Sequence, residues 1–174
     1  YETAAAVADE VKAVMADRYT GQCFVARGDA FPDALAASPW AYAQGAPVLL
    51  TRPDSLPEST ALAIRECGTA GVYIIGGTTA VSPAVSAAID ALPGIGAPRR
   101  ISGDDRYATA VEVARAAAGI GPDGLDIPVL GWHEVGLATG LDFPDALAGG
   151  AACGARGGVL LLTLPDTLAP ATKT

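Results

Sequence analysis

Short apolar runs alternate with helical patterns along the 174-residue chain. The runs are mostly continuous, which is typical of strands buried on both faces of a parallel sheet. They lie at Cys23–Ala26, Pro47–Thr51, Val72–Ile75, Arg99–Ser102, Val135–Thr139 and Val159–Thr163. Strands alternating with helices predict an α/β fold with right-handed crossovers.

Helical spacing and helix-start signals fill the gaps between these runs. Apolar residues recur at helical spacing from Tyr1 to Met15, and again from Tyr107 to Ala118. Ser82-Pro83 predicts an N-cap followed by proline at the first helical position. Ser55-x-x-Glu58 has the spacing of a capping box, which predicts a second helix start. We therefore expect each helix to follow its strand closely.

The phrase Phe-Pro-Asp-Ala-Leu-Ala occurs twice, beginning at Phe31 and at Phe143. Tyr1-x-Thr-Ala likewise returns at Tyr107, but the first spacing is 112 residues and the second 106. The six extra residues fall in the Gly- and Pro-rich stretch 119–128, which has the composition of a loop. The repeat predicts parallel-sheet βα units with flanking helices in two tandem modules, 1–97 and 98–174. The second stops before an equivalent of 71–77.

Each copy of the repeated phrase opens a helix directly after a strand. In a parallel sheet such turns lie on the carboxyl edge, where α/β proteins bind ligands and helix N-termini offer N–H groups to anions. We expect Asp29, Asp33, Arg52, Gly76, Gly77, Asp104 and Arg106 to share one rim. Helix capping is the alternative explanation for the carboxylates. The candidate ligand-binding residues are Arg27, Asp29, Asp33, Arg52, Gly76, Gly77, Arg100, Asp104, Arg106, Asp142 and Asp145.

Sequence motifs of catalysis are missing. The chain has no nucleophile elbow, phosphate-binding P-loop or zinc-protease motif, and Gly76-Gly77 lacks the spacing of a dinucleotide fingerprint. The single histidine, His133, has no serine or cysteine obviously paired with it. At its strand-to-helix turn, Asp104-Asp105 fits capping better than cation binding. The sequence therefore predicts no catalytic residue, no cofactor and no metal site.

Composition argues against several classes of protein. A net charge of −8 argues against nucleic acid as a partner, because phosphate binding draws on clustered lysine and arginine. The apolar runs are shorter than the roughly 20 residues that a membrane span needs. Cys23, Cys67 and Cys153 fit small buried hydrophobes. A Cys23–Cys67 disulfide at the amino edge of the sheet is the alternative.

Four ordered phrases resemble the cell wall-binding repeat 2 family of Gram-positive surface proteins. They lie at Arg100–Ala110, Ala138–Ala148, Pro47–Thr51 and Ile75–Ser82. The chain departs from these phrases at Arg27, where the family has threonine, and at Val159, where it has proline. The resemblance implies a non-catalytic module of an exported protein, located outside the cell in the wall. It also implies non-covalent binding to an anionic wall polymer or to peptidoglycan, and packing against further modules of the same protein.

An acidic domain should repel an anionic polymer at long range, so local groups must provide the attraction. Arg52, Arg100 and Arg106 are best placed, although Arg106 can instead pair with a cap or pack between modules. Two other functions stay open. One is an α/β enzyme acting on a sugar or nucleotide at the same edge, and the other is a structural spacer. We also expect the open sheet edge of the second module to be covered by the first module or by another chain, which would give a homo-oligomer.

Overall fold

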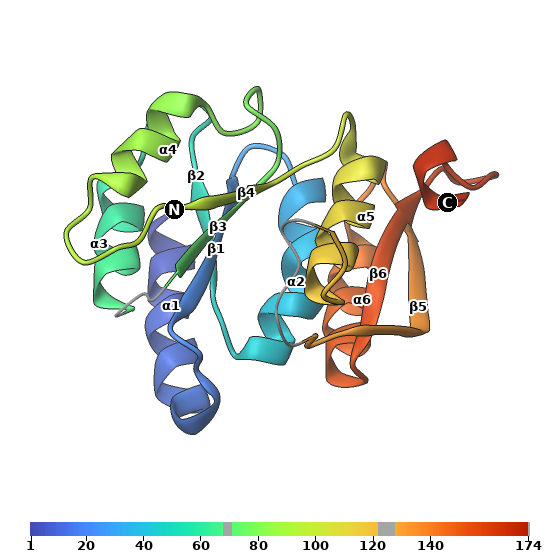
Figure 1. The fold of residues 1–174 in the computed structure, drawn as a ribbon, viewed down its shortest axis with the longest axis horizontal. Coiled ribbons are helices and arrows are strands. Elements are labelled where there is room, and N and C mark those ends of the chain that lie inside the picture. Colours follow the sequence, from blue (N-terminus) through green and yellow to red (C-terminus); the bar gives the residue numbers. More distant parts are fainter. Residues whose placement is uncertain (68–70, 122–127, 174) are drawn as a thin grey trace.

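Two parallel sheets form the framework of the molecule in the computed structural model, which describes residues 1–67, 71–121 and 128–173 (Figure 1). The first sheet has the strand order β2-β1-β3-β4, and the second pairs β5 with β6. The α/β fold with parallel strands is thus confirmed. The strands are β1 (Gln22–Arg27), β2 (Val48–Thr51), β3 (Gly71–Ile75), β4 (Arg99–Ile101), β5 (Gly131–Thr139) and β6 (Gly158–Thr163).

The strand that was expected to begin at Val135 begins earlier, at Gly131. Gly131 pairs with Gly158, and the pairing then shifts register before Val135 pairs with Val159. This irregularity breaks the apolar pattern, because residues 132–134 are polar or exposed and carry no continuous apolar run. The early part of β5 therefore depends on pairing with β6, which the local sequence does not reveal.

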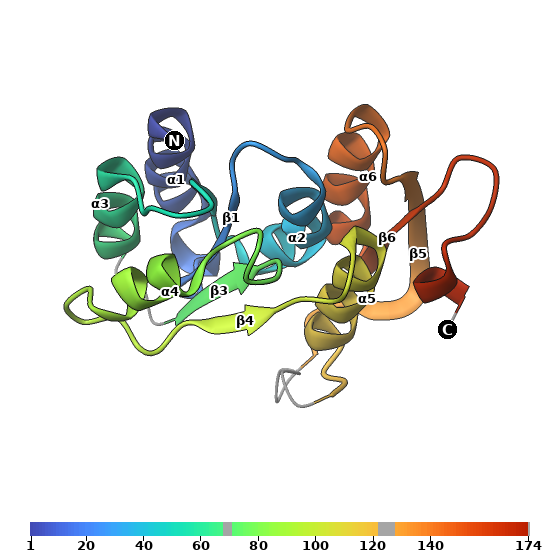
Figure 2. The same ribbon diagram turned by 90° about the horizontal axis from the view of Figure 1, so that it is seen from above.

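Helices cover both faces of the first sheet (Figure 2). Apolar residues of α1, α3 and α4 pack on one face, and those of α2 and α5 pack on the other. The helices are α1 (Glu2–Met15), α2 (Pro32–Gln44), α3 (Glu58–Glu66), α4 (Pro83–Asp90), α5 (Arg106–Ala117) and α6 (Pro144–Ala155), with short 3-10 turns η1 (Ala16–Arg18) and η2 (Pro170–Lys173). Each described helix is too short or too polar to cross a bilayer.

Three aromatic side chains form the centre of the core under α2. Phe24 lies 5.1 Å from Trp40 and 5.5 Å from Tyr73, and the Trp40 and Tyr73 rings are 4.7 Å apart, all between ring centroids. All three residues are buried. Aromatic pairs at such distances contribute about 0.5–1.5 kcal/mol beyond the burial of their area. The remaining core is built mainly from alanine and valine, which lets helices approach the sheet closely.

One predicted helix start is confirmed and one is wrong. The Ser82 hydroxyl accepts a hydrogen bond from the Val85 amide at 3.4 Å, as expected of an N-cap. Helix α3 begins at Glu58 with Pro57 as its N-cap, and no side chain caps it. Because Pro57 holds an extended backbone there, the chain enters the helix two residues later than the predicted capping box requires. Ser55 instead donates to the Asp54 carboxylate at 3.2 Å.

The internal repeat is visible in the backbone, which confirms two tandem related modules. Strands β1 and β2 pair Val25 with Leu49, and β5 and β6 pair the equivalent Leu137 with Leu161. The Gly28 and Gly140 amides each donate, at 2.8 Å, to the carbonyl of the last threonine of the neighbouring strand. The same register and the same closing bond therefore recur in both modules.

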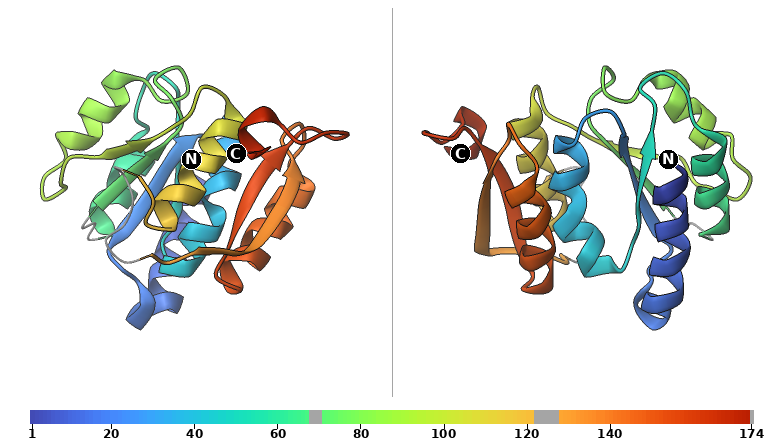
Figure 3. Two further views of the ribbon diagram at one scale, coloured as in Figure 1. Left: turned by 45° about the vertical axis from the view of Figure 1, so that its right-hand side comes forward. Right: turned by 180° about the vertical axis from the view of Figure 1, so that it is seen from behind.

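The modules meet through equivalent helices, because α2 packs on α6 (Figure 3). A side chain at Gly154 would collide with Tyr42 and with the backbone of Pro39, so the two helices are in close contact. Strand β4 pairs with β3 and so completes the first sheet, although the expected boundary at residue 97 assigns it to the second module. That boundary stays a prediction.

The cysteines are all buried. The structure records Cys23, Cys67 and Cys153 as thiols, so among the described residues the Cys23–Cys67 disulfide is not formed. Cys23 and Cys67 do belong to one apolar cluster. Burial, together with these two nearby sulfurs, raises the pKa of the Tyr19 hydroxyl. The disulfide stays a prediction for protein that has met an oxidant.

Candidate functional site

A polar cleft of about 270 Å³ opens at the carboxyl edge of the first sheet. It lies between the end of β1, the start of α2, the turn after β3 and the start of α5. The edge expected from strand order therefore does carry a hollow. Its lining includes the candidate residues Arg27, Asp33, Gly77, Asp104 and Arg106.

Asp33 stands in the first turn of α2, with its carboxylate against the backbone of Gly76. Gly76 has φ +109°, and a Cβ at that position would collide with Asp33 Oδ2. Glycine is therefore required there for two reasons, the backbone conformation and the close approach. Burial raises the pKa of the Asp33 carboxyl, and the positive charges of Arg27 and Arg106 oppose that rise.

Arg27 and Asp29 form a two-pronged ion pair on the rim. Nε and Nη2 of Arg27 donate to the two carboxylate oxygens of Asp29, both at 2.7 Å. The hydrogen bond from Arg27 lowers the pKa of the Asp29 carboxyl, and the same bond raises the pKa of Arg27. Asp29 is therefore engaged with Arg27 and does not line the polar cleft.

Arg100 and Arg106 each hold a backbone carbonyl at the end of a strand. Arg100 Nη1 donates to the Gly76 carbonyl at 2.7 Å, and burial lowers the pKa of Arg100. Arg106 Nη1 donates to the Gly140 carbonyl just after β5. This hydrogen bond links Arg106 to the residue that follows β5, and it involves neither a helix cap nor a residue of 1–97. The side chain of Arg106 is nevertheless exposed enough to line the cleft.

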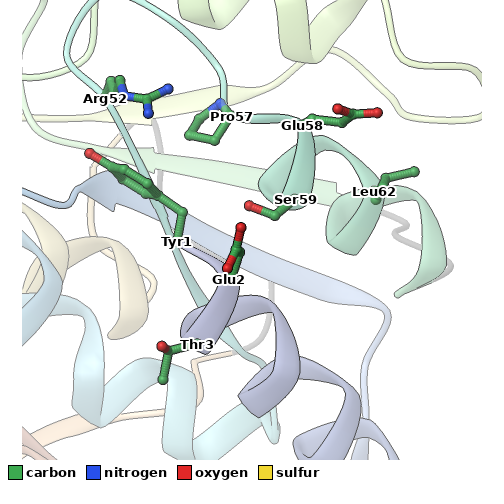
Figure 4. A pocket seen from close by; sticks show the side chains of 8 residues that line it. All are labelled: Tyr1, Glu2, Thr3, Arg52, Pro57, Glu58, Ser59 and Leu62. Atoms are coloured by element: carbon green, nitrogen blue, oxygen red, sulfur yellow. The ribbon is translucent and has the colours of Figure 1, made fainter.

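Arg52 lies in a different and larger hollow, of about 640 Å³, between the starts of α1 and α3 (Figure 4). Its guanidinium stands over the Tyr1 ring, 5.2 Å from the ring centroid. Glu2 and Glu58 line the same hollow and make it partly acidic. The predicted single rim is therefore divided, with Arg52 apart from the cleft.

The two candidates beside the second copy of the repeated phrase, Asp142 and Asp145, also lie apart from the cleft. Asp142 Oδ1 accepts a hydrogen bond from the Phe143 amide at 2.8 Å, and Asp145 occupies the first turn of α6. Both side chains are exposed. Asp145 has the helix-dipole environment that was part of the alternative explanation for the carboxylates, but neither aspartate caps α6, whose N-cap is Phe143 without a side-chain hydrogen bond.

Three polar residues of the cleft, Thr79, Asp105 and Thr109, are missing from the sequence-based candidates. Asp105 caps α5 by accepting from the Ala108 amide at 2.8 Å, and Thr109 Oγ1 accepts from the Gly103 amide at 3.0 Å. Both line the cleft. The sequence did hold a signal for Thr109, because this residue belongs to the repeated Tyr-x-Thr-Ala phrase. Its equivalent in the first copy of the phrase, Thr3, lines the Arg52 hollow.

Neither metal binding nor histidine chemistry finds support in this geometry. Within the described ranges, no group of three or more His, Cys, Asp or Glu side chains is arranged to hold a metal ion. His133 is exposed, with Nε2 3.3 Å from the Arg156 carbonyl. The cleft offers guanidinium donors beside carboxylate acceptors, a combination that suits a ligand bearing both hydroxyl and anionic groups.

Comparison with known families gives a match over both modules. The family model described as cell wall binding domain 2 (CWB2) matches residues 1–86 and 100–174.

Two curated relatives come from Bacillus subtilis (strain 168). N-acetylmuramoyl-L-alanine amidase LytC is 43% identical over 89 residues, or 51% of this chain. The protein named Amidase enhancer is 34% identical over 140 residues, or 80% of this chain. The match spans only 18% of the length of each relative.

Two solved structures share the fold. Cwp6 from Clostridium difficile superposes with a TM-score of 0.76 at 23% identity, covering 98% of this chain and 25% of that one. Cwp8 from the same organism gives a TM-score of 0.70 at 26% identity, covering 89% of this chain and 25% of that one.

Proposed function

Since this chain belongs to the cell wall binding domain 2 family, we propose that it holds a larger exported protein in the wall of a Gram-positive bacterium by binding an anionic wall polymer non-covalently. The relatives support a role as the anchoring part of a larger protein. The matching portion is 18% of the length of each relative, and one of them is named as an amidase. On this proposal the chain works outside the cell and does no chemistry of its own.

The polar cleft at the end of β1 is the observation that carries the proposal. It offers two kinds of contact to a sugar polymer with anionic groups. Arg27 and Arg106 each keep N–H donors beyond those used by Asp29 and Gly140, because a guanidinium has five. The carboxylates of Asp33 and Asp104 can accept from sugar hydroxyls.

These local hydrogen-bond donors can overcome the repulsion between the acidic chain and an anionic polymer. The net charge of −8 repels an anion at long range, where salt screens it beyond roughly 10 Å at 0.1 M ionic strength. A direct charge-assisted hydrogen bond contributes about 1.5–3 kcal/mol. Such contacts can therefore outweigh the repulsion once the polymer is seated.

The test is retention on purified walls of Arg106→Gln against Arg115→Gln. Arg115 is exposed in the last turn of the same helix, away from the cleft, so it is a matched control. We expect Arg106→Gln to weaken binding about tenfold and Arg115→Gln to leave it unchanged. Raised salt should release the wild type. Arg52→Gln decides whether the Arg52 hollow contributes as well.

The melting temperature of each variant separates binding from folding. If Arg106→Gln lowers Tm without changing retention on walls, Arg106 has only a structural role through the Gly140 carbonyl. Retention on walls stripped of anionic polymer would reject that ligand in favour of peptidoglycan or a protein. If nucleotides or sugar nucleotides stabilise the protein and walls do not bind it, the protein is an enzyme. If it binds neither walls nor nucleotides, it is a structural spacer.

A further inference from the structure

We propose that the polar cleft binds a ligand that carries both charges, an anionic group and a protonated amine. The anionic group contacts Arg27 and Arg106. The amine contacts the carboxylates of Asp33 and Asp104. The ligand class is therefore an anionic wall polymer whose repeats also bear a free amine, from an unacetylated amino sugar or from an aminoacyl ester. The inference rests on the proposed function, because it specifies which polymer the cleft recognises.

The side chains that line the polar cleft carry more negative than positive charge. Two are arginines and three are aspartates: Arg27, Arg106, Asp33, Asp104 and Asp105. The charge of Arg27 is already offset by Asp29, through two hydrogen bonds of 2.7 Å at the rim. Asp105 faces the amide end of α5, where it accepts from the Ala108 amide. One arginine charge, that of Arg106, therefore stands against the carboxylate charges of Asp33 and Asp104.

Asp33 is the carboxylate that most needs a partner. It is half-buried in the first turn of α2. Within residues 1–67, 71–121 and 128–173, no hydrogen bond or ion pair reaches its carboxylate. Arg27 and Arg106 act on it only through space, where their charges oppose the rise in its pKa that burial causes. All three side chains line the cleft, so a bound ligand can contact each of them.

The equivalent aspartate of the second copy shows that a helix start alone does not create this environment. Asp145 also occupies the first turn of its helix, α6, but its side chain is exposed and lies outside the cleft. Asp33 differs because α5 packs on α2 and lines the cleft with Arg106 and Thr109. The half-buried carboxylate without a partner is therefore a property of the cleft.

A protonated amine fits these carboxylates better than a sugar hydroxyl does. An anion on Arg106 would share a hollow of about 270 Å³ with Asp33 and Asp104, and like charges that close repel each other. A hydroxyl can donate to a carboxylate, but it leaves that repulsion in place. An ammonium group offers three donors and a positive charge, so it satisfies the carboxylates and offsets the anion.

The experiment measures retention of the protein on four preparations of one purified wall, at about 0.15 M salt to screen long-range repulsion. The first is untreated. The second is treated with acetic anhydride in aqueous bicarbonate, which acetylates free amines. The third is treated with mild alkali, which hydrolyses aminoacyl esters but leaves amino sugars, and the fourth is stripped of anionic polymer. We expect the wild type to bind acetylated walls about tenfold more weakly than untreated walls.

The variant Asp33→Asn tests whether this loss arises in the cleft. Asparagine keeps the shape of the side chain and removes its negative charge. The variant should therefore bind untreated walls about tenfold more weakly than the wild type, and acetylation should weaken it no further. Asp145→Asn is the matched control, since it makes the same change outside the cleft, and it should behave as the wild type. Thermal unfolding of both variants separates lost binding from lost folding.

The alkali-treated walls identify the source of the amine. Equal losses on alkali-treated and acetylated walls support an aminoacyl ester, and a loss on acetylated walls alone supports an amino sugar. The proposal is overturned if acetylation leaves the wild type bound, or if Asp33→Asn binds untreated walls as the wild type does. It is also overturned if acetylation weakens Asp33→Asn as much as the wild type, because the cause would then be general repulsion. The proposed function fails separately, if walls stripped of anionic polymer still retain the wild type.

Discussion

Phe31 and Phe143, the first residues of the two copies of the repeated phrase, contact each other with ring centroids 5.9 Å apart and ring planes at 59°. Each precedes the helix that its module uses at the interface, α2 or α6. Side chains at Gly150 and Gly154 would meet Ser38 and Tyr42, their own equivalents in α2. The two modules thus contact each other through the equivalent helix of each copy, α2 and α6.

The α2–α6 contact predicts opposite effects for one substitution at two positions of the same helix. At Gly154 a methyl group would meet the Pro39 carbonyl and Tyr42, whereas at Gly149 the end of Leu160, at 3.6 Å, is the one neighbour among the described residues. We expect Gly154→Ala to lower the free energy of unfolding by about 1–3 kcal/mol through overpacking. Gly149→Ala should raise it by about 0.5–1 kcal/mol, since alanine favours helix. Urea unfolding measures both, and equal effects would contradict the close contact.

The buried carboxyl of Asp33 predicts a pH-dependent gain from Asp33→Asn. Its folded-state pKa is raised, so its contribution to stability is fully present below the unfolded value, near 3.9, and is lost as pH rises through the folded value. At pH 7 the ionised wild type therefore bears a penalty that asparagine avoids. We expect Asp33→Asn to unfold at higher urea at pH 7, with the difference shrinking below about pH 4.

Denaturation curves between pH 3 and pH 8 check this, with Asp145→Asn as the exposed control in the equivalent helix turn. A variant less stable than the wild type at pH 7 would mean that attraction to Arg27 and Arg106 outweighs burial.

The repeated threonine bonds predict unequal losses at equivalent positions. Thr60 is buried and donates to the Leu50 carbonyl, so Thr60→Val leaves that acceptor unpaired in the core at a cost of about 1–3 kcal/mol. Thr172 makes the same bond to Leu162 but is only half-buried, and water can replace it. We expect Thr172→Val to cost less than half as much by thermal unfolding. Equal costs would show that the two turns are equally enclosed.

The Cys23–Cys67 disulfide remains a prediction for protein exposed to an oxidant. Two thiols would exchange with one external protein disulfide, forming the internal bond and releasing two external thiols. Closing a loop of roughly 44 residues would add about 4 kcal/mol in the chain-entropy model. Thiol titration of denatured, unreduced protein should then find one thiol, that of Cys153. Three thiols would exclude the bridge, and Cys23→Ser with Cys67→Ser should abolish the gain in Tm.

The sequence by itself determined the strands apart from the early part of β5, most helix starts and the two-module repeat. These features are local, because continuous apolar runs, proline at the first helical position and a phrase recurring at fixed spacing need no knowledge of distant contacts. Asp33 and Arg106 could also be placed on the carboxyl edge, because each follows a predicted strand and all strands of a parallel sheet end at that edge.

Tertiary structure decided how that edge is divided and which of its charges are engaged. Arg27 is held by Asp29, Arg100 by the carbonyl of Gly76, and Arg106 by the carbonyl of Gly140. Arg52 stands in another hollow. These partners depend on how side chains extend and on how α5 and α6 dock against α2, and neither follows from spacing along the chain. The exposure of Leu137 beside the burial of Val25 has the same origin, since a repeated strand has the same register in both copies but not the same neighbours.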